Sequence, residues 1–212
     1  MKSKELHIFV LSSNQKELNQ KTSNSLQLFE LFPLEITWIN NLVDIKDIHI
    51  LAPYCLLIPA GDHLTKSYLD GFFAMPKILN YAYQPYYSYI FSKRGSIFYR
   101  KNTDITPRTD EINTLLLAPH HSRHIIFPSF LLKKIIEDNI FPENIFWRIS
   151  QSLIENDICI AVLPDSISIE YLNYTIHHKE EIYKNVFPSI ANTIFSHKNF
   201  LITQNFSDLY GD

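Results

Sequence analysis

The stretch Leu6-His7-Ile8-Phe9-Val10-Leu11-Ser12-Ser13-Asn14 decides the fold. Residues 6–11 form an almost continuous apolar run, which is typical of a strand in a parallel sheet that is covered on both faces. Residues 12–14 end that strand, and Asn14 followed by Glu17 is a capping-box pattern that predicts the start of a helix. The helix should extend to about Leu31. Its inner face should carry Leu18, Thr22, Leu26 and Phe29.

Two further strands follow along the chain. Residues 35–39 predict a strand parallel to the first, which closes a right-handed βαβ unit. Residues 44–50 are short and mixed, and they fit either a turn of helix or an edge strand. Residues 54–58 predict a third strand, which the sequence Pro59-Ala60-Gly61-Asp62 stops because proline and glycine do not continue a central ladder.

The rest of the chain alternates helical and β-rich patterns. The predicted helices are 64–73, 129–138, 145–155 and 179–197, the last bent or broken at Pro188. The predicted β segments are 81–99 with a hairpin turn at 93–96, a short strand at 114–117, and strands at 158–163 and 166–171. This order predicts an α/β protein. We expect one domain over residues 1–212, with a C-terminal helical segment at about 179–212.

The composition narrows the class of function. The chain has 212 residues, of which 46% are hydrophobic and 19% are charged, so it can build a core. A net charge of −3 argues against nucleic acid as the main partner. With only 4 glycines, no glycine-rich phosphate loop is present. The cysteines, Cys55 and Cys159, lie in apolar runs and are expected to be reduced core thiols. No stretch has the length of a spanning helix, and no signal peptide is evident.

The pieces resemble a family 2 glycosyltransferase with the GT-A fold. Residues 9–14 resemble the family's opening "IIPTYN", residues 35–41 resemble "EIIVVDD", and residues 54–64 resemble "YILFLDADDxL". Farther along, residues 127–143 resemble "FRRELLEKIGLFDE" and residues 158–165 resemble "KIAYLPD". The resemblance implies a single GT-A-like domain with a mostly parallel central sheet flanked by helices. It also implies transfer of a sugar from a nucleotide diphosphate sugar to an acceptor hydroxyl, in bacterial surface glycan synthesis.

The resemblance assigns roles to particular residues. Donor or nucleotide contacts would come from Ser12, Asn14, Asn40 and Asn41, and from Asp62, which falls one position after the family's metal-binding DxD motif. Glu143 would be the general base that accepts the proton of the acceptor hydroxyl. Each has a simpler interpretation: the asparagines as caps and turn formers, Asp62 as a turn residue, and Glu143 as a carboxylate at a helix start.

The metal site departs from the family pattern. The DxD positions fall on Pro59, Ala60 and Gly61, so Asp62 is the one carboxylate left to hold Mn²⁺ or Mg²⁺. A divalent cation is therefore expected to bind weakly. The sequence His120-His121-Ser122-Arg123-His124 supplies cations instead. His121 and Arg123 would face the diphosphate and stabilise the leaving group without a metal. A zinc site and a polar surface loop are the alternatives for this cluster.

Three functions remain open at this point. The first is the glycosyltransferase, with a glycan or lipid-linked acceptor and a cytoplasmic location, at most peripheral at the inner face of the membrane. The second is a binding or scaffolding protein that kept the GT-A fold and lost catalysis, which the missing carboxylates favour. The third is an unrelated α/β enzyme.

Overall fold

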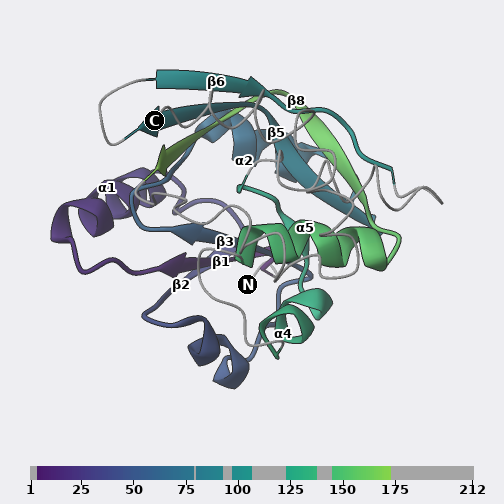
Figure 1. Cartoon of the computed structure of the whole chain (residues 1–212), viewed down its shortest axis with the longest axis horizontal. Helices are drawn as coiled ribbons and strands as arrows, with labels where there is room; N and C mark the ends of the chain where they lie inside the picture. Colours follow the sequence, from purple (N-terminus) through teal and green to yellow (C-terminus); the bar gives the residue numbers. More distant parts are fainter. Residues whose placement is uncertain (1–3, 79, 93–96, 107–122, 138–144, 173–212) are drawn as a thin grey trace, which may run out of the picture.

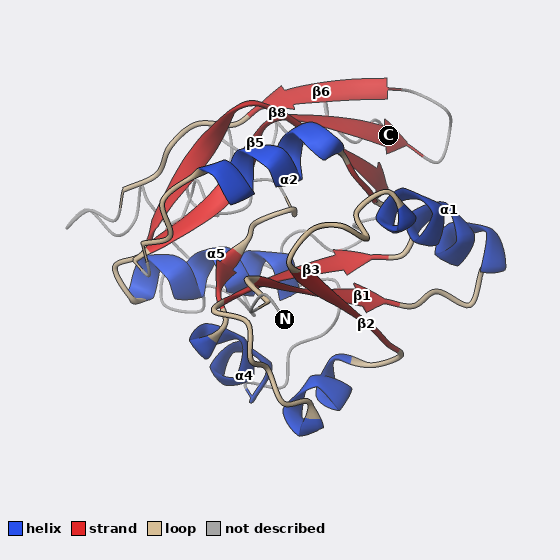
Figure 2. Ribbon diagram, turned by 180° about the vertical axis from the view of Figure 1, so that it is seen from behind, coloured by secondary structure: helices blue, strands red, loops and turns tan. Residues whose placement is uncertain are grey.

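The computed structural model describes residues 4–78, 80–92, 97–106, 123–137 and 145–172. These residues form two four-stranded sheets with helices around them (Figures 1 and 2). Sheet A has the strand order β2-β1-β3-β7, and sheet B has the order β4-β8-β5-β6. The predictions for residues 107–122, 138–144 and 173–212 lie outside the described residues, and with them the short strand at 114–117, the C-terminal helix, His121 and Glu143.

Sheet A begins with the predicted parallel unit. Strands β1 (Leu6–Leu11) and β2 (Leu34–Ile39) are joined by helix α1 (Lys16–Gln27), and β3 (Tyr54–Pro59) pairs with β1 on its other side. Both neighbours of β1 are parallel to it, and every residue of β1 is buried. The three strands are thus confirmed within one residue at their ends.

Two details around α1 and β2 differ from the predictions. The N-cap of α1 is Gln15, and Asn14 is exposed, so the predicted Asn14–Glu17 capping box is wrong. The side chain of Asn19 instead returns to residue 13, accepting from its N–H at 2.9 Å and donating to its carbonyl at 2.8 Å. The helix ends at Gln27, short of Leu31; beyond it Phe29 is buried, whereas Leu28 and Leu31 lie exposed.

Sheet A is mixed, which corrects the predicted mostly parallel central sheet. Its fourth strand, β7 (Phe127–Pro128), runs antiparallel to β3. A second sheet then takes the later strands: β4 (His63–Leu64), β5 (Tyr81–Ser92), β6 (Ile97–Lys101) and β8 (Cys159–Leu172). The two strands predicted at 158–163 and 166–171 are one strand, since β8 continues past a register shift opposite Pro85 and Tyr87.

The helices occupy the remaining faces. Helix α2 (Lys66–Ala74) packs against β8, and the 3₁₀ helix η1 (Leu42–Asp47) lies against helix α4 (Phe130–Glu137). Helix α5 (Ile145–Glu155) packs against α4 and β8. Two apolar clusters result, one on each side of sheet A, because alternate residues of β1 and β3 enter opposite clusters. Among the described residues, no helix has the length and apolar character needed to cross a membrane.

Both cysteines are free thiols, as predicted. Cys55 is fully buried in β3, and Cys159 at the start of β8 is only partly buried. Burial raises the pKa of the Cys55 thiol.

Candidate functional site

The carboxyl ends of β1, β2 and β3 meet at one edge of sheet A. Leu11 is in register with Ile39 on one side and with Pro59 on the other. The Ser12 N–H donates to the Ile39 carbonyl at 2.8 Å, and the Ala60 N–H donates to the Leu11 carbonyl at 2.8 Å. The edge therefore brings together the three segments that the sequence predicted to bind a nucleotide, as open parallel sheets do for their ligands.

The predicted polar residues at this edge differ in exposure. Ser12 is partly buried, whereas Asn14, Asn40 and Asn41 are exposed to solvent. Asn41 has a structural task, since it forms a capping box with Asp44, whose Oδ2 accepts from the Asn41 N–H at 3.0 Å. The same oxygen accepts from the Asn40 N–H at 3.2 Å, which fixes the turn that follows β2.

Asp62 lies in a tight turn that follows β3 at this edge of sheet A. Gly61 has φ 108°, a conformation that a residue with a side chain rarely adopts. Thr22 of α1 stabilises the turn, because its hydroxyl accepts from the Gly61 N–H and donates to the Asp62 carbonyl, both at 2.8 Å. The turn directs the Asp62 side chain away from solvent, and its exposed fraction is 0%.

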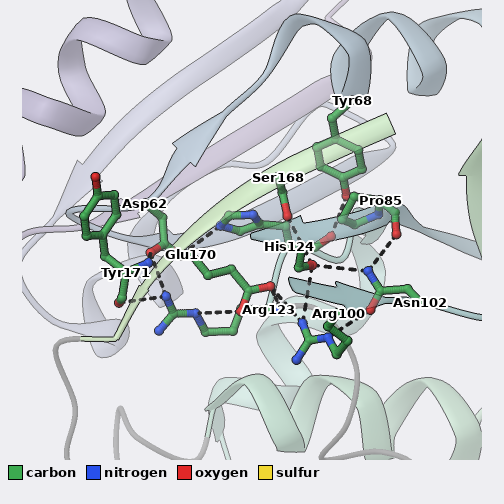
Figure 3. Close-up of polar contacts among 11 residues, drawn as sticks. Asp62, Tyr68, Pro85, Arg100, Asn102, Arg123, His124, Ser168, Glu170 and Tyr171 are labelled. Atoms are coloured by element: carbon green, nitrogen blue, oxygen red, sulfur yellow. Dashed lines mark hydrogen bonds and ion pairs between the residues drawn. The ribbon is translucent and has the colours of Figure 1, made fainter. Parts of the chain in front are cut away.

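Three groups of this chain contact the carboxylate oxygens of Asp62 (Figure 3). Oδ1 accepts from Arg123 Nη2 at 2.6 Å and from the Tyr171 N–H at 2.7 Å. Oδ2 lies 2.9 Å from Nε2 of His124, whose side chain is also fully buried. Both carboxylate oxygens are thus engaged by groups of the described residues, Oδ1 by two and Oδ2 by one.

A second carboxylate extends the cluster into sheet B. Glu170 Oε1 accepts from Arg100 Nη2 at 2.9 Å and from the Arg123 N–H at 3.3 Å, and its Oε2 lies 3.6 Å from Arg123 Nε. Arg100 Nε also donates to Asn102 Oδ1 at 3.0 Å, and Asn102 Nδ2 donates to the Pro85 carbonyl at 2.7 Å. The result is a buried ion cluster of Asp62, Arg100, Arg123, His124 and Glu170. Its two carboxylates face two guanidinium groups, which limits the cost of burying these charges.

Side-chain hydrogen bonds also fix the backbone around the buried ion cluster. The Tyr68 hydroxyl of α2 donates to the His124 carbonyl at 2.6 Å, and burial raises the pKa of this phenol. Arg123 Nη2 donates to the Tyr171 carbonyl at 2.9 Å, so one arginine bridges the β3 turn and β8. The cluster thereby joins the carboxyl edge of sheet A to the end of sheet B.

Two more basic residues lie beside the cluster. His63 follows Asp62, and its ring lies 5.6 Å from the Tyr171 ring; burial lowers its pKa more than the neighbouring Asp62 carboxylate raises it. Lys21 Nζ lies 5.0 Å from the centre of the same tyrosine ring. The surroundings of Asp62 are therefore rich in basic groups.

The sequence predicted only part of this arrangement. It named Asp62, Arg123 and the histidines before β7, but it did not pair them with each other. Glu170, Arg100 and Tyr171 were missed as site residues. Glu170 carried a signal, since Ile167, Ile169 and Tyr171 share one face of β8 and leave Glu170 on the other. Within the described ranges, no group of three histidine, cysteine or acidic residues is arranged to hold a metal ion.

Comparison with known proteins adds no further assignment. No protein-family model matches the sequence, and a search of curated proteins finds no match.

Proposed function

We propose that this chain binds a nucleotide diphosphate sugar at the carboxyl edge of sheet A and transfers the sugar to an acceptor hydroxyl. The observation that carries the proposal is the meeting of three parallel strand ends beside a buried pair of basic side chains, Arg123 and His124. The resemblance to family 2 glycosyltransferases points to the same edge. The protein would act in the synthesis of a bacterial surface glycan.

The donor would be held by strand ends and side chains. Ser12, Asn14 and Asn40 would contact the nucleoside, since serine and asparagine side chains both donate and accept hydrogen bonds. The diphosphate would lie toward the Asp62 turn, where Arg123, His63 and Lys21 surround one carboxylate. Positive charge at this point would stabilise the departing nucleotide diphosphate.

The reaction would be metal-independent. Both oxygens of Asp62 already have donors of this chain, so Arg123 and His124 take the place that Mn²⁺ or Mg²⁺ would need. The role of Glu143 as the base that accepts the proton of the acceptor hydroxyl remains a prediction from the sequence.

A thermal unfolding titration tests donor binding. Uridine and guanosine diphosphates are added to the full chain with Mn²⁺ or with EDTA. At a concentration of about 100 times Kd, the ligand should stabilise the fold by about 2.7 kcal/mol and raise Tm, with the same shift in EDTA. Asn40→Ala should reduce the shift, while Asn80→Ala, an exposed asparagine at the start of sheet B, should leave it unchanged. Absence of a Tm shift with either nucleotide would overturn the proposal.

A binding protein without catalysis is the second candidate. It is favoured by the absence of carboxylates at the DxD positions 59–61 and by the ion pairs that already engage Asp62, the next residue. Release of free nucleotide diphosphate from the sugar donor, with an added glycan hydroxyl or water taking the sugar, separates the two candidates. Binding followed by release supports the transferase, whereas binding of the donor without any release over hours supports the binding protein.

A further inference from the structure

The outer face of sheet B carries a continuous array of aromatic and apolar side chains. In the strand pairing, Tyr89 of β5 lies opposite Tyr99 of β6 and Ile169 of β8. Every second residue of these three strands lies on the same face, so further cross-strand rows form on either side of this one. Alternate residues of the same strands, such as Ser88 and Glu170, are buried on the inner face. The outer array consists of Tyr87, Tyr89, Phe91, Ile97, Tyr99, Lys101, Ile167, Ile169 and Tyr171.

Several members of this outer array are open to solvent. Tyr99 is 70% exposed, Ile97 59% and Tyr89 38%, although large apolar side chains are usually covered when they gather on one face. The rings are already arranged against each other. Tyr87 and Tyr99 meet edge to face at 6.3 Å, and Phe91 stacks on Tyr171 at 5.2 Å. A ligand would therefore meet a preformed surface and would order few side chains on binding.

The charge of the outer array is positive. Lys101 is its one charged member, and its Nζ lies 5.1 Å from the ring centre of Tyr86. Lys21 adds a second ammonium group at the ring of Tyr171. The carboxylate of Glu170 belongs to the inner face, where Arg100 and Arg123 neutralise it. Charge complementarity thus favours an anionic ligand.

We propose that the outer array binds an anionic glycan, with sugar rings stacked on Tyr89 and Tyr99 and an acidic group near Lys101. Tyrosines suit this ligand because the ring offers an apolar face and the hydroxyl offers a hydrogen bond. A membrane surface fits less well, since anionic lipids are bound by clusters of several lysines or arginines, whereas the array has Lys101 and, beside Tyr171, Lys21. Identifying this glycan with the acceptor rests on the proposed function, whereas binding itself does not.

Calorimetric titration of the full chain tests the inference with polygalacturonate as the anionic glycan and dextran as the neutral one. Polygalacturonate should bind more tightly than dextran. Tyr99→Ala and Tyr89→Ala should each weaken its binding about tenfold, the loss typical of an exposed aromatic anchor. Lys101→Ala should remove the preference for polygalacturonate over dextran. The matched controls are Trp38→Ala, an aromatic residue 39% exposed on sheet A, and Lys46→Ala on η1.

Three results would overturn the inference. One is failure of polygalacturonate to bind. Another is an equal loss in Trp38→Ala and Tyr99→Ala, which would place the glycan elsewhere. The third is binding to vesicles of phosphatidylglycerol that depends on Tyr99 while polygalacturonate does not compete, which would make the array a membrane surface. The Tm shift with nucleotide in Tyr99→Ala keeps this test separate from that of the proposed function, because the variant should retain it.

Discussion

Replacing Asp62 by asparagine tests the account of the buried ion cluster most directly. Asparagine is almost the same size and keeps an oxygen that can accept from the Tyr171 N–H, now 2.7 Å away. It removes the charge that faces Arg123 and His124 at 2.6 and 2.9 Å. The Arg123 side chain is only 13% exposed, so after the change its charge would rely on the more distant Glu170 carboxylate, 3.6 Å from Nε, in place of the 2.6 Å contact with Asp62. Breaking a buried ion pair from one side costs about 3–5 kcal/mol, and we expect that loss in the free energy of unfolding at neutral pH.

Urea unfolding followed by circular dichroism measures this loss. Asp70→Asn is the matched control, because Asp70 pairs with Lys66 on the surface of α2 and such a pair contributes at most about 0.5 kcal/mol. The double variant Asp62→Asn/Arg123→Met should lose less than the sum of the two single variants, since both charges are then absent. A loss of less than about 1 kcal/mol in Asp62→Asn would refute the reasoning. So would stabilisation of the wild type by Mn²⁺ that disappears in this variant, because Asp62 would then be a metal ligand.

Three further predictions concern the supports of sheet A. Thr22→Val removes the hydroxyl that bonds to Gly61 and Asp62 and leaves the buried Gly61 N–H without its acceptor. The free energy of unfolding, measured by urea unfolding, should therefore fall by about 1–3 kcal/mol. Thr22→Ser keeps a hydroxyl and should restore most of that free energy. Burial lowers the pKa of His7 below its ordinary value of 6.5. The unfolded chain then takes up more protons below about pH 6.5, and the free energy of unfolding should decrease as the pH falls from about 7 to about 5. His7→Gln should flatten that slope; an unchanged slope would contradict the assignment. Cys55 should not react with a thiol reagent in the folded protein, and its modification rate should follow urea unfolding; rapid modification of the native chain would show that β3 is more open than described.

Much of the secondary structure could be predicted from local pattern. The run of residues 6–11 is apolar at nearly every position, which specifies a strand buried on both faces. The helix predicted at 145–155 was likewise confirmed, and β5 and β6 pair antiparallel as expected, while the predicted turn at 93–96 lies outside the described residues. The start of α1 was predicted wrongly because several polar side chains near residues 13–19 can cap a helix, and sequence alone does not choose among them.

The sheet arrangement depended on contacts that local pattern does not carry. Two residues, Phe127 and Pro128, suffice to add an antiparallel strand to sheet A, and so short a segment has no periodicity to read. Residues 166–171 alternate polar and apolar side chains, a pattern typical of a half-exposed strand, yet the polar Ser166, Ser168 and Glu170 are the buried ones. Polar residues on a buried face are recognised only when their partners are known, because a hydrogen-bonded or ion-paired group can be buried where a lone one cannot.

The α/β alternation, the three parallel strands and the polar residues that end them follow from apolar periodicity and turn residues, which are local properties of the chain. The role of Asp62 follows only from contacts made in the folded protein. Its partners Arg123, His124 and Tyr171 lie about 60 to 110 residues away along the chain. The pairing of β7 with β3 brings Arg123 and His124 within 3 Å of Asp62, and β8 of sheet B brings Tyr171 there. Asp62, which the sequence suggests as a metal ligand, is therefore a buried, ion-paired group in the structure, since the energy of a charge depends on its neighbours in space.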